Sequence, residues 1–265
     1  MSDEVEVRVV DGVAEVRLNR PARKNALNLQ MFDALAEAGE ALKTQAGLRA
    51  VILHGAGGDF CAGLDLEVMQ SLAGRLDEMR ERLLNPAQGE RANWFQKPCY
   101  VWQELGVPVI AAIEGVCLGG GMQLALAADF RIARADARLS VMEAKWGLIP
   151  DMGISQTLPK LLRADQAKEL MMTARMLSGE AALDLGLITR LMDDPIAQAR
   201  QFARELALKS PDALRGVKRL VDRTWALPEG DGLAVEAALQ APILGAPNQI
   251  EAVMANLQKR APKFS

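Results

Sequence analysis

Residues 113–133 read IEGVCLGGGMQLALAADFRIA, and this stretch decides the fold. An apolar run ends at Ile113, three glycines follow at 119–121, and a helical pattern continues from about Met122 to Ala128. Glycines at a strand-to-helix turn permit unusual backbone angles and close approach by a ligand. The first N–H groups of the helix lack intrahelical partners and lie at the positive end of its dipole, so they suit a negatively charged oxygen. From the glycines alone, a tight packing turn is the favoured interpretation.

The flanking sequence predicts further strands and turns. A second glycine-bearing turn, 60–66 (FCAGLDL), follows a buried strand predicted at 48–54 (LRAVILH). Another buried strand is predicted at 107–113 (VPVIAAI), where a proline marks its start. Two alternating runs on either side of Asp11-Gly12 predict a β-hairpin. Short strands are predicted at 130–133 and 137–141, after the glycine-rich turn.

The second half of the chain has helical patterns only. We expect helices at 156–175, 180–185, 196–209, 211–225, 232–240 and 248–259. Strands and helices therefore mix in the first part of the chain and helices alone follow. The sequence predicts an α/β core in residues 1–200 and a helical part in residues 201–265.

Composition excludes several classes of function. A net charge of −3 on 265 residues gives no general attraction to nucleic acid or to an anionic membrane. The N-terminus lacks the basic and apolar regions of a signal peptide, and no 18-residue apolar run exists. We therefore expect a cytoplasmic protein that binds neither nucleic acid nor membrane.

Few side chains are available for metal or nucleophilic chemistry. The chain has one histidine, His54, and three cysteines, Cys61, Cys99 and Cys117, none of them in a C-x-x-C pair. This disfavours histidine-based triads and histidine-rich metal sites, and it argues against a disulfide framework. His54, Cys61 and Cys117 are interpreted as structural residues. Chemistry must therefore come from carboxylates, backbone groups or a cysteine.

Four blocks carry a resemblance to a known family. They are NRPARKNALN (19–28), GAGGDFCAGLDL (55–66), the quoted stretch 113–133, and VMEAKWGLIPDMGISQTLPKL (141–161). In order and spacing they resemble the enoyl-CoA hydratase/isomerase (crotonase) family. The resemblance implies a crotonase-type spiral of ββα units with a helical C-terminal oligomerisation region, assembled as a homotrimer or a dimer of trimers. It implies an acyl-CoA substrate and no separate cofactor, because coenzyme A enters as part of the substrate.

The resemblance also implies where the substrate binds. The N–H groups of Leu64 and Gly120 would form an oxyanion hole for the thioester carbonyl oxygen, each contributing about 3–4 kcal/mol in the transition state. The residues expected near coenzyme A are Arg23, Lys24, Ala26, Ala62, Asp65 and Leu66. Asp65 is interpreted as a brace for its loop, and a solvated surface pair remains an equal alternative for Arg23 and Lys24.

Acid and base groups decide the reaction. Hydratases of the family carry two glutamates, and the matching positions here are Gln123 and Glu143. An amide cannot exchange a proton usefully near neutral pH, which disfavours simple hydration. Enoyl-CoA isomerases use one carboxylate at the Glu143 position. Asp151 matches an aspartate of dienoyl-CoA isomerases, although a turn-capping role is open for it. Gln123 could instead satisfy a buried hydrogen bond.

The predicted function is therefore enoyl-CoA hydration or isomerisation, acting on 2- or 3-enoyl-CoA. Alternatives on the same scaffold are acyl-CoA hydrolysis, dehalogenation or decarboxylation, or a non-catalytic, RNA-binding role. Candidates for the acyl pocket are the aromatic side chains Trp94, Phe95, Tyr100, Trp102 and Trp146. Core packing is an equal interpretation for Trp102.

Overall fold

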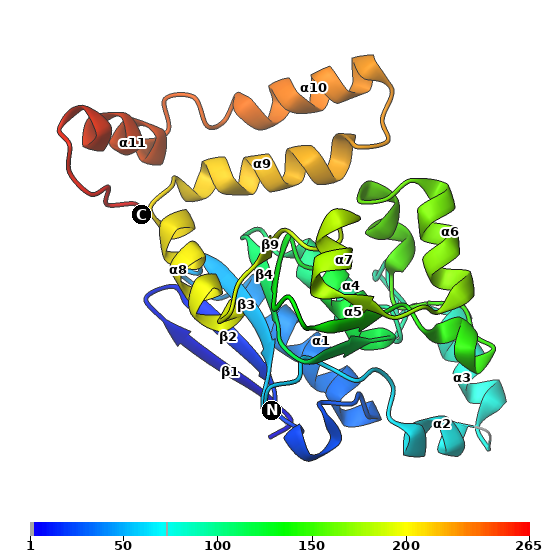
Figure 1. Cartoon of the computed structure of the whole chain (residues 1–265). Coiled ribbons are helices and arrows are strands. Elements are labelled where there is room, and N and C mark those ends of the chain that lie inside the picture. Colours follow the sequence, from blue (N-terminus) through cyan, green and yellow to red (C-terminus); the bar gives the residue numbers. More distant parts are fainter. Residues whose placement is uncertain (1–2, 73) are drawn as a thin grey trace.

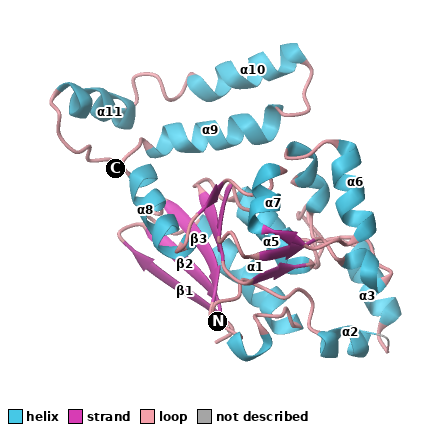
Figure 2. Cartoon of the chain, viewed as in Figure 1, coloured by secondary structure: helices cyan, strands magenta, loops and turns pink. Residues whose placement is uncertain are grey.

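The structure is a computed structural model that describes residues 3–72 and 74–265. A six-stranded sheet forms its centre (Figures 1 and 2). Its strands are β1 (Val5–Val10), β2 (Val13–Leu18), β3 (Ala50–Gly55), β4 (Val109–Ile113), β6 (Phe130–Ala133) and β9 (Arg190–Leu191), in the order β1-β2-β3-β4-β6-β9. The β1–β2 pair is the hairpin predicted around Asp11-Gly12, and all later pairs are parallel. The predicted α/β class is confirmed.

Helices cover both faces of this sheet (Figure 1). In the core part of the chain they are α1 (Leu29–Lys43), α2 (Leu66–Leu72), α3 (Leu76–Leu84), α4 (Lys97–Glu104), α5 (Gly120–Leu126), α6 (Ala164–Thr173), α7 (Gly179–Asp184) and α8 (Pro195–Ala207). Successive side chains of a strand point to opposite faces. Val51 and Leu53 of β3 therefore pack in the cluster that contains α1 and α4, whereas Ala50 and Ile52 pack against α8. Burial on both faces explains the continuous apolar sequence of β3.

A small second sheet holds the glycine-rich turn. It contains β5 (Val116–Leu118), β7 (Arg138–Ser140) and β8 (Leu177–Ser178), in the order β5-β7-β8. Strand β5 leads through Gly119 directly into α5, which begins two residues earlier than the predicted helix. The Gly119 N–H donates to the Ser140 carbonyl oxygen of β7 at 2.9 Å. The start of α5 is therefore fixed against this sheet.

The predicted helix at 156–175 is wrong in its first half. Two 3₁₀ turns, Ile154–Gln156 and Leu158–Lys160, precede α6, which begins only at Ala164. Pro159 lies in the second turn, and it cannot donate the backbone hydrogen bond that a continuous α-helix requires. The segment before α6 consequently stays irregular. Helix α4 was not predicted from the sequence.

A helical arm follows α8 and projects from the core (Figure 1). It consists of α9 (Pro211–Thr224), α10 (Glu229–Gln240) and α11 (Pro247–Leu257), as the sequence predicts. The buried Lys218 ammonium of α9 donates to the Trp102 and Val107 carbonyl oxygens and, at 2.8 Å, to Asp129 Oδ2. Burial raises the pKa of Asp129 despite this ammonium. One cation thus anchors the arm to the α4–β4 segment.

Within the described residues, no helix is both long enough and apolar enough to span a bilayer.

Candidate active site

Two turns from distant parts of the chain lie side by side. Cys61 and Cys117 form a parallel β-bridge, in which the Leu118 N–H donates to the Cys61 carbonyl oxygen at 2.9 Å. Beyond the bridge, the Gly63 backbone packs against the Leu118–Gly119 backbone so closely that a Cβ atom at Gly63 would lie 2.7 Å from the Leu118 oxygen. This contact brings the 60–66 turn against the triple-glycine turn, as the candidate oxyanion hole requires.

Both predicted donor amides lie in these turns. The Leu27 N–H donates to the Gly63 oxygen and the Asp65 N–H donates to the Leu27 oxygen, so the Leu64 N–H points away from Leu27. Gly120 is the first residue of α5, where an N–H has no intrahelical partner. Within residues 3–72 and 74–265, neither amide donates a hydrogen bond. Both remain available to an oxygen of a ligand.

A cavity of about 540 Å³ adjoins the two turns. Leu64 and Gly120 line it, together with the three predicted acid–base residues Gln123, Glu143 and Asp151. Most of the remaining wall is apolar. Its apolar side chains include Leu76, Met79, Leu83, Phe95, Trp146, Leu148, Ile149 and Met152. The structure therefore brings the backbone donors and the carboxylates into one largely apolar hollow.

Glu143 has one restrained oxygen and one open oxygen. The Gln123 Nε2 amide donates to Glu143 Oε1 at 2.7 Å, and Oε1 also lies 3.5 Å from where a Cβ at Gly119 would be. Glu143 Oε2 is buried and accepts no hydrogen bond from the described residues. Burial raises the pKa of Glu143, the Gln123 amide opposes this, and the negative charge of Asp151 adds to it. A raised pKa suits a general base near neutral pH.

Asp151 lies in the same cavity. Burial raises the pKa of its carboxyl group. Its neighbour Met152 donates its N–H to Gln123 Oε1 at 2.8 Å. The carboxyl group of Asp151 accepts from the backbone N–H of Asp151 itself, which lowers the pKa without overcoming burial, so the turn-capping alternative stays open. Two carboxyl groups with raised pKa values therefore face one apolar space.

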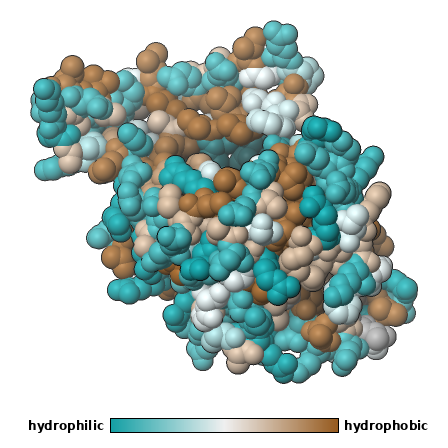
Figure 3. Space-filling view, viewed as in Figure 1, coloured by the Kyte–Doolittle hydropathy of each residue, from teal (hydrophilic) through white to brown (hydrophobic). Residues whose placement is uncertain are grey.

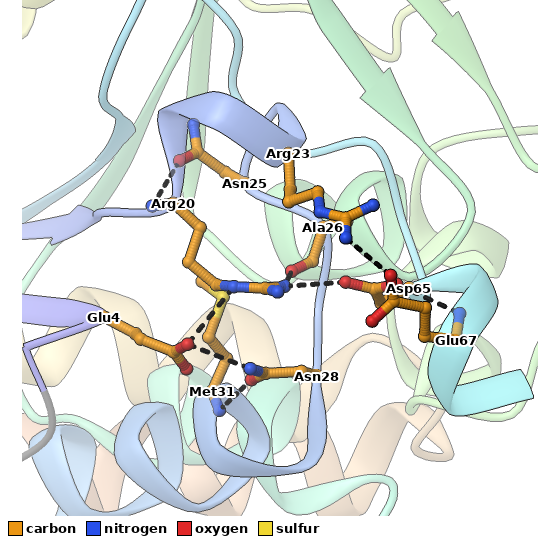
Figure 4. Close-up of polar contacts among 9 residues, drawn as sticks. All are labelled: Glu4, Arg20, Arg23, Asn25, Ala26, Asn28, Met31, Asp65 and Glu67. Atoms are coloured by element: carbon orange, nitrogen blue, oxygen red, sulfur yellow. Dashed lines mark hydrogen bonds and ion pairs between the residues drawn. The ribbon is translucent and has the colours of Figure 1, made fainter. Parts of the chain in front are cut away.

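Figure 4 shows how the 19–28 loop is held beside the cavity. The Arg20 guanidinium contacts Glu4, donates to the Ala26 carbonyl oxygen and pairs with Asp65 Oδ2 at 3.0 Å. Burial opposes ionisation of Asp65, but the Glu67 N–H and Arg20 together hold the pKa of its carboxyl below its usual value. The sequence interpretation of Asp65 as a loop brace agrees with these contacts.

Asn25 completes this loop, and the sequence reasoning missed it. Its side chain is fully buried, accepts from the Arg20 N–H and donates to two carbonyl oxygens of the 56–59 turn. Its φ of 55° lies in the left-handed region, where asparagine is better tolerated than most residues. The sequence offered one signal for this role, namely an asparagine that follows the two basic residues Arg23 and Lys24 in a loop.

The residues predicted near coenzyme A separate into two groups. The cavity wall includes Arg23, Ala26, Ala62, Asp65 and Leu66, whereas Lys24 is absent from it. Arg23 pairs with Glu67 at the exposed rim (Figure 4), and the exposed Lys24 ammonium pairs with Asp59. These positions leave coenzyme A binding as a prediction, with Arg23 nearer to the cavity than Lys24.

Of the aromatic candidates for the acyl pocket, some line the cavity and others do not. Phe95 and Trp146 line the cavity. Trp94 stacks on Phe32, and Trp102 is fully buried with its indole N–H donating to a backbone oxygen of its own helix. Trp102 is therefore a core residue. The apolar side chains that α3 contributes were missed, because α3 is polar in sequence and only packing identifies its inner face.

Cys61, Cys99 and Cys117 are free and fully buried, and burial raises the pKa of the Cys61 thiol to about 12. A thiol that stays neutral is a poor nucleophile. His54 is likewise buried, and burial lowers its pKa. The structural interpretation of these residues fits their surroundings.

Comparison with known proteins gives the family. The family model for enoyl-CoA hydratase/isomerase matches residues 8–265. The mitochondrial methylglutaconyl-CoA hydratase of Mus musculus is 32% identical, over 99% of this chain and 83% of that protein. The peroxisomal Delta(3,5)-Delta(2,4)-dienoyl-CoA isomerase of Arabidopsis thaliana is also 32% identical, over 94% of this chain and 91% of that protein.

Solved structures agree with this result. The crystal structure of an enoyl-CoA hydratase from Bacillus anthracis matches with a TM-score of 0.89 at 30% identity, covering 99% of each chain. This likeness confirms the crotonase-type fold expected from the four sequence blocks. The chain therefore belongs to the enoyl-CoA hydratase/isomerase family of enzymes.

Proposed function

We propose that the enzyme isomerises the double bond of an enoyl-CoA, with Glu143 as the base and the Leu64 and Gly120 amides as the oxyanion hole. The observation that supports this most is the state of Glu143. Its Oε2 is buried without a partner in an apolar cavity, while an amide occupies the position of a second glutamate. The site thus offers a carboxylate with one unengaged oxygen beside two N–H groups that donate to no described residue.

The reaction moves one proton within the substrate. Glu143 takes a proton from the α-carbon of a 3-enoyl-CoA, and the electron pair passes through the double bond system onto the thioester oxygen. The two N–H donors stabilise that oxygen where negative charge develops. Glu143 then returns the proton to the γ-carbon, which gives a 2-enoyl-CoA. No electrons are gained or lost overall, so the step requires no redox cofactor.

Hydration of a 2-enoyl-CoA is the second candidate, and Asp151 is the observation that favours it. Its carboxyl group faces the same cavity and interacts electrostatically with Glu143. A second carboxyl group could handle one proton of a water molecule while Glu143 handles the other. The similarity to a relative named as a hydratase also supports this candidate.

Product identification tests both candidates. The purified protein is incubated separately with a 3-enoyl-CoA and a 2-enoyl-CoA, and products are separated by chromatography and mass. We expect the 3-enoyl-CoA to be converted to 2-enoyl-CoA with no change of mass. A main product heavier by one water would favour hydration. Release of free coenzyme A would indicate acyl-CoA hydrolysis and contradict both candidates.

We also infer that the helical arm associates with other copies of the chain, as a homotrimer or a dimer of trimers. Large apolar side chains of the arm are exposed in the single chain: Val217, Val221, Trp225, Leu233, Leu244 and Leu257. Figure 3 shows apolar atoms gathered along the arm above the hollow that separates it from the core. A second cavity of about 460 Å³, lined by α9, lies there. Exposed apolar surface of this kind favours association.

Light scattering after size-exclusion chromatography tests the assembly. We expect a mass three or six times the 28.7 kDa of one chain. Trp225→Glu places a charge among the exposed apolar side chains of the arm and should lower this mass. Trp146→Glu changes the wall of the first cavity and should leave the mass unchanged. A wild-type mass of one chain would contradict the proposal. The cytoplasmic location stays a prediction from the sequence.

A further inference from the structure

The Met152 side chain packs against the first residue of α5. A Cβ atom at Gly120 would lie 2.8 Å from Met152 Sδ and 3.7 Å from its Cε, so the thioether fills the space next to the Gly120 backbone. The Leu27 side chain also approaches this point, at 3.1 Å. Met152 is 5% exposed and lines the cavity of about 540 Å³. A thioether therefore borders the cavity directly beside one of the two candidate oxyanion donors.

The backbone of Met152 is held in place. Its N–H donates to Gln123 Oε1 at 2.8 Å, and the Gln123 side chain is itself buried. Residue 152 cannot move away from α5 without breaking this buried hydrogen bond, which would cost about 1–3 kcal/mol. A chemical change at the sulfur must therefore be felt at Gly120, because the turn that carries the sulfur is tethered.

Oxidation is the change to which a thioether is open. It converts the apolar sulfur into a sulfoxide, which is polar and carries an oxygen that accepts hydrogen bonds. An oxygen of this kind needs a donor when it is buried. The Gly120 N–H lies beside the sulfur and donates to no described residue. A sulfoxide oxygen would therefore compete for the hydrogen bond that the thioester oxygen of a substrate requires.

We propose that Met152 is an oxidative modification site, at which hydrogen peroxide forms a sulfoxide whose oxygen accepts from the Gly120 N–H and so blocks the oxyanion hole. A lone pair of the sulfur attacks one peroxide oxygen, the S–O bond forms as the O–O bond breaks, and water leaves after proton transfer. The sulfur is oxidised by two electrons and the peroxide is reduced. The inference rests on the proposed function only for the catalytic task of the Gly120 amide.

The other methionines of the cavity lack this arrangement. Met142 approaches Gly119 through its Cγ methylene, and the Gly119 N–H already donates to the Ser140 oxygen. The remaining two, on α2 and α3, are not among the atoms nearest to a Cβ at Gly119 or Gly120. They are Met69 and Met79.

The cysteines are poor competitors for peroxide. Cys61, Cys99 and Cys117 are free and fully buried. Burial raises the pKa of the Cys61 thiol to about 12 and that of the other two well above the usual value. The thiolate is the form that reacts, so these neutral thiols are oxidised slowly.

A time course with wild-type protein tests the proposal. The protein is treated with hydrogen peroxide, the peroxide is removed with catalase, and each sample is divided between kinetics with a 3-enoyl-CoA and peptide mass spectrometry. We expect the remaining kcat to equal the fraction of unmodified Met152, because a lost oxyanion donor lowers kcat by about 10²–10³. Met172 is 72% exposed and should be oxidised before activity falls. Activity that falls while Met152 is still unmodified would overturn the proposal.

Two variants give the matched comparison, each measured against its own untreated activity. Met152→Leu keeps an apolar side chain of similar volume without a sulfur, and it should retain at least half of its kcat after the same treatment. Met142→Leu removes another sulfur of the cavity wall and should be inactivated like wild type. Inactivation of folded Met152→Leu at the wild-type rate would contradict the role of this sulfur. Circular dichroism checks the fold, and the time course decides if Met152→Leu does not fold.

A binding measurement separates this proposal from the proposed isomerisation. Butyryl-CoA is a saturated thioester that cannot isomerise, and its affinity is measured by calorimetry before and after oxidation. The loss of one hydrogen bond to the thioester oxygen should weaken binding by about tenfold. Unchanged affinity with Met152 fully oxidised would show that the sulfoxide leaves the donor free. Wild-type protein that loses affinity on oxidation but converts no 3-enoyl-CoA would refute the isomerisation alone.

Discussion

Replacing Glu143 with glutamine is expected to lower kcat by about 10³-fold, because the enzyme loses the base proposed to take the α-proton. Glutamine has nearly the same volume, and its amide oxygen can still accept the hydrogen bond from Gln123. The cavity wall and the oxyanion donors remain, so KM for an enoyl-CoA should change by less than about threefold. Steady-state kinetics with a 3-enoyl-CoA and proton-exchange at the α-carbon in heavy water measure both effects.

Glu114→Gln is the matched control for charge removal. Glu114 directly precedes the glycine-rich segment but does not line the cavity. Its replacement should leave kcat within about twofold. Glu143→Asp should be intermediate, since a shorter side chain keeps the charge but retracts the free oxygen from the substrate. Wild-type turnover in Glu143→Gln would remove Glu143 from the mechanism.

The second large effect is expected from Gly63→Ala, a change that adds one methyl group to a turn. The new Cβ would lie 2.7 Å from the Leu118 backbone oxygen, so one of the two turns must move. Movement at this contact separates the Leu64 and Gly120 amides, and one misplaced oxyanion donor costs about 10²–10³ in kcat. The side chains of the site stay intact. Kinetics together with thermal unfolding measure the separate effects on catalysis and stability.

Gly58→Ala controls for backbone strain. Gly58 has a φ of 80°, close to the 88° of Gly63, but a Cβ there meets no atom within 4 Å. The left-handed backbone alone should lower the free energy of unfolding by about 1–2 kcal/mol in both variants, and Gly63→Ala should lose more because its Cβ also clashes with the Leu118 oxygen. Only Gly63→Ala should lose activity. Equal activity in the two variants would show that the Gly63–Leu118 contact does not position the donors.

The sequence predicts the central architecture well, because local pattern and burial agree there. Alternation around Asp11-Gly12 predicts the hairpin, and the uninterrupted apolar run of β3 predicts a strand covered on both faces. Asparagine is a preferred N-cap residue, and Asn28 caps α1 by accepting from the Met31 N–H through its Oδ1. Prediction fails where a local pattern is overridden by a residue that the pattern does not account for. The segment before α6 has helical periodicity, yet Pro159 and its surroundings make 3₁₀ turns.

The candidate site could likewise be predicted only in part from the sequence. The residues Leu64, Gly120, Glu143, Asp151 and Gln123 could be named from four ordered blocks, and all five line one cavity. Their hydrogen bonds could not be named, because these join segments that are far apart in the chain. The bond from Met152 to Gln123 spans 29 residues and fixes an orientation that no sequence pattern records. The inner face of α3 is equally a product of packing.

The hydrogen that position 64 donates belongs to a peptide bond and not to a side chain. Every amino acid except proline supplies it, so the leucine side chain is free to vary while the hydrogen stays where it is. That side chain lines the cavity. A library built at position 64 would therefore reshape the room for the acyl group without touching charge stabilisation, whereas its neighbour at 63 admits glycine alone. New substrate preferences are therefore accessible at a position that directly follows a tightly constrained glycine.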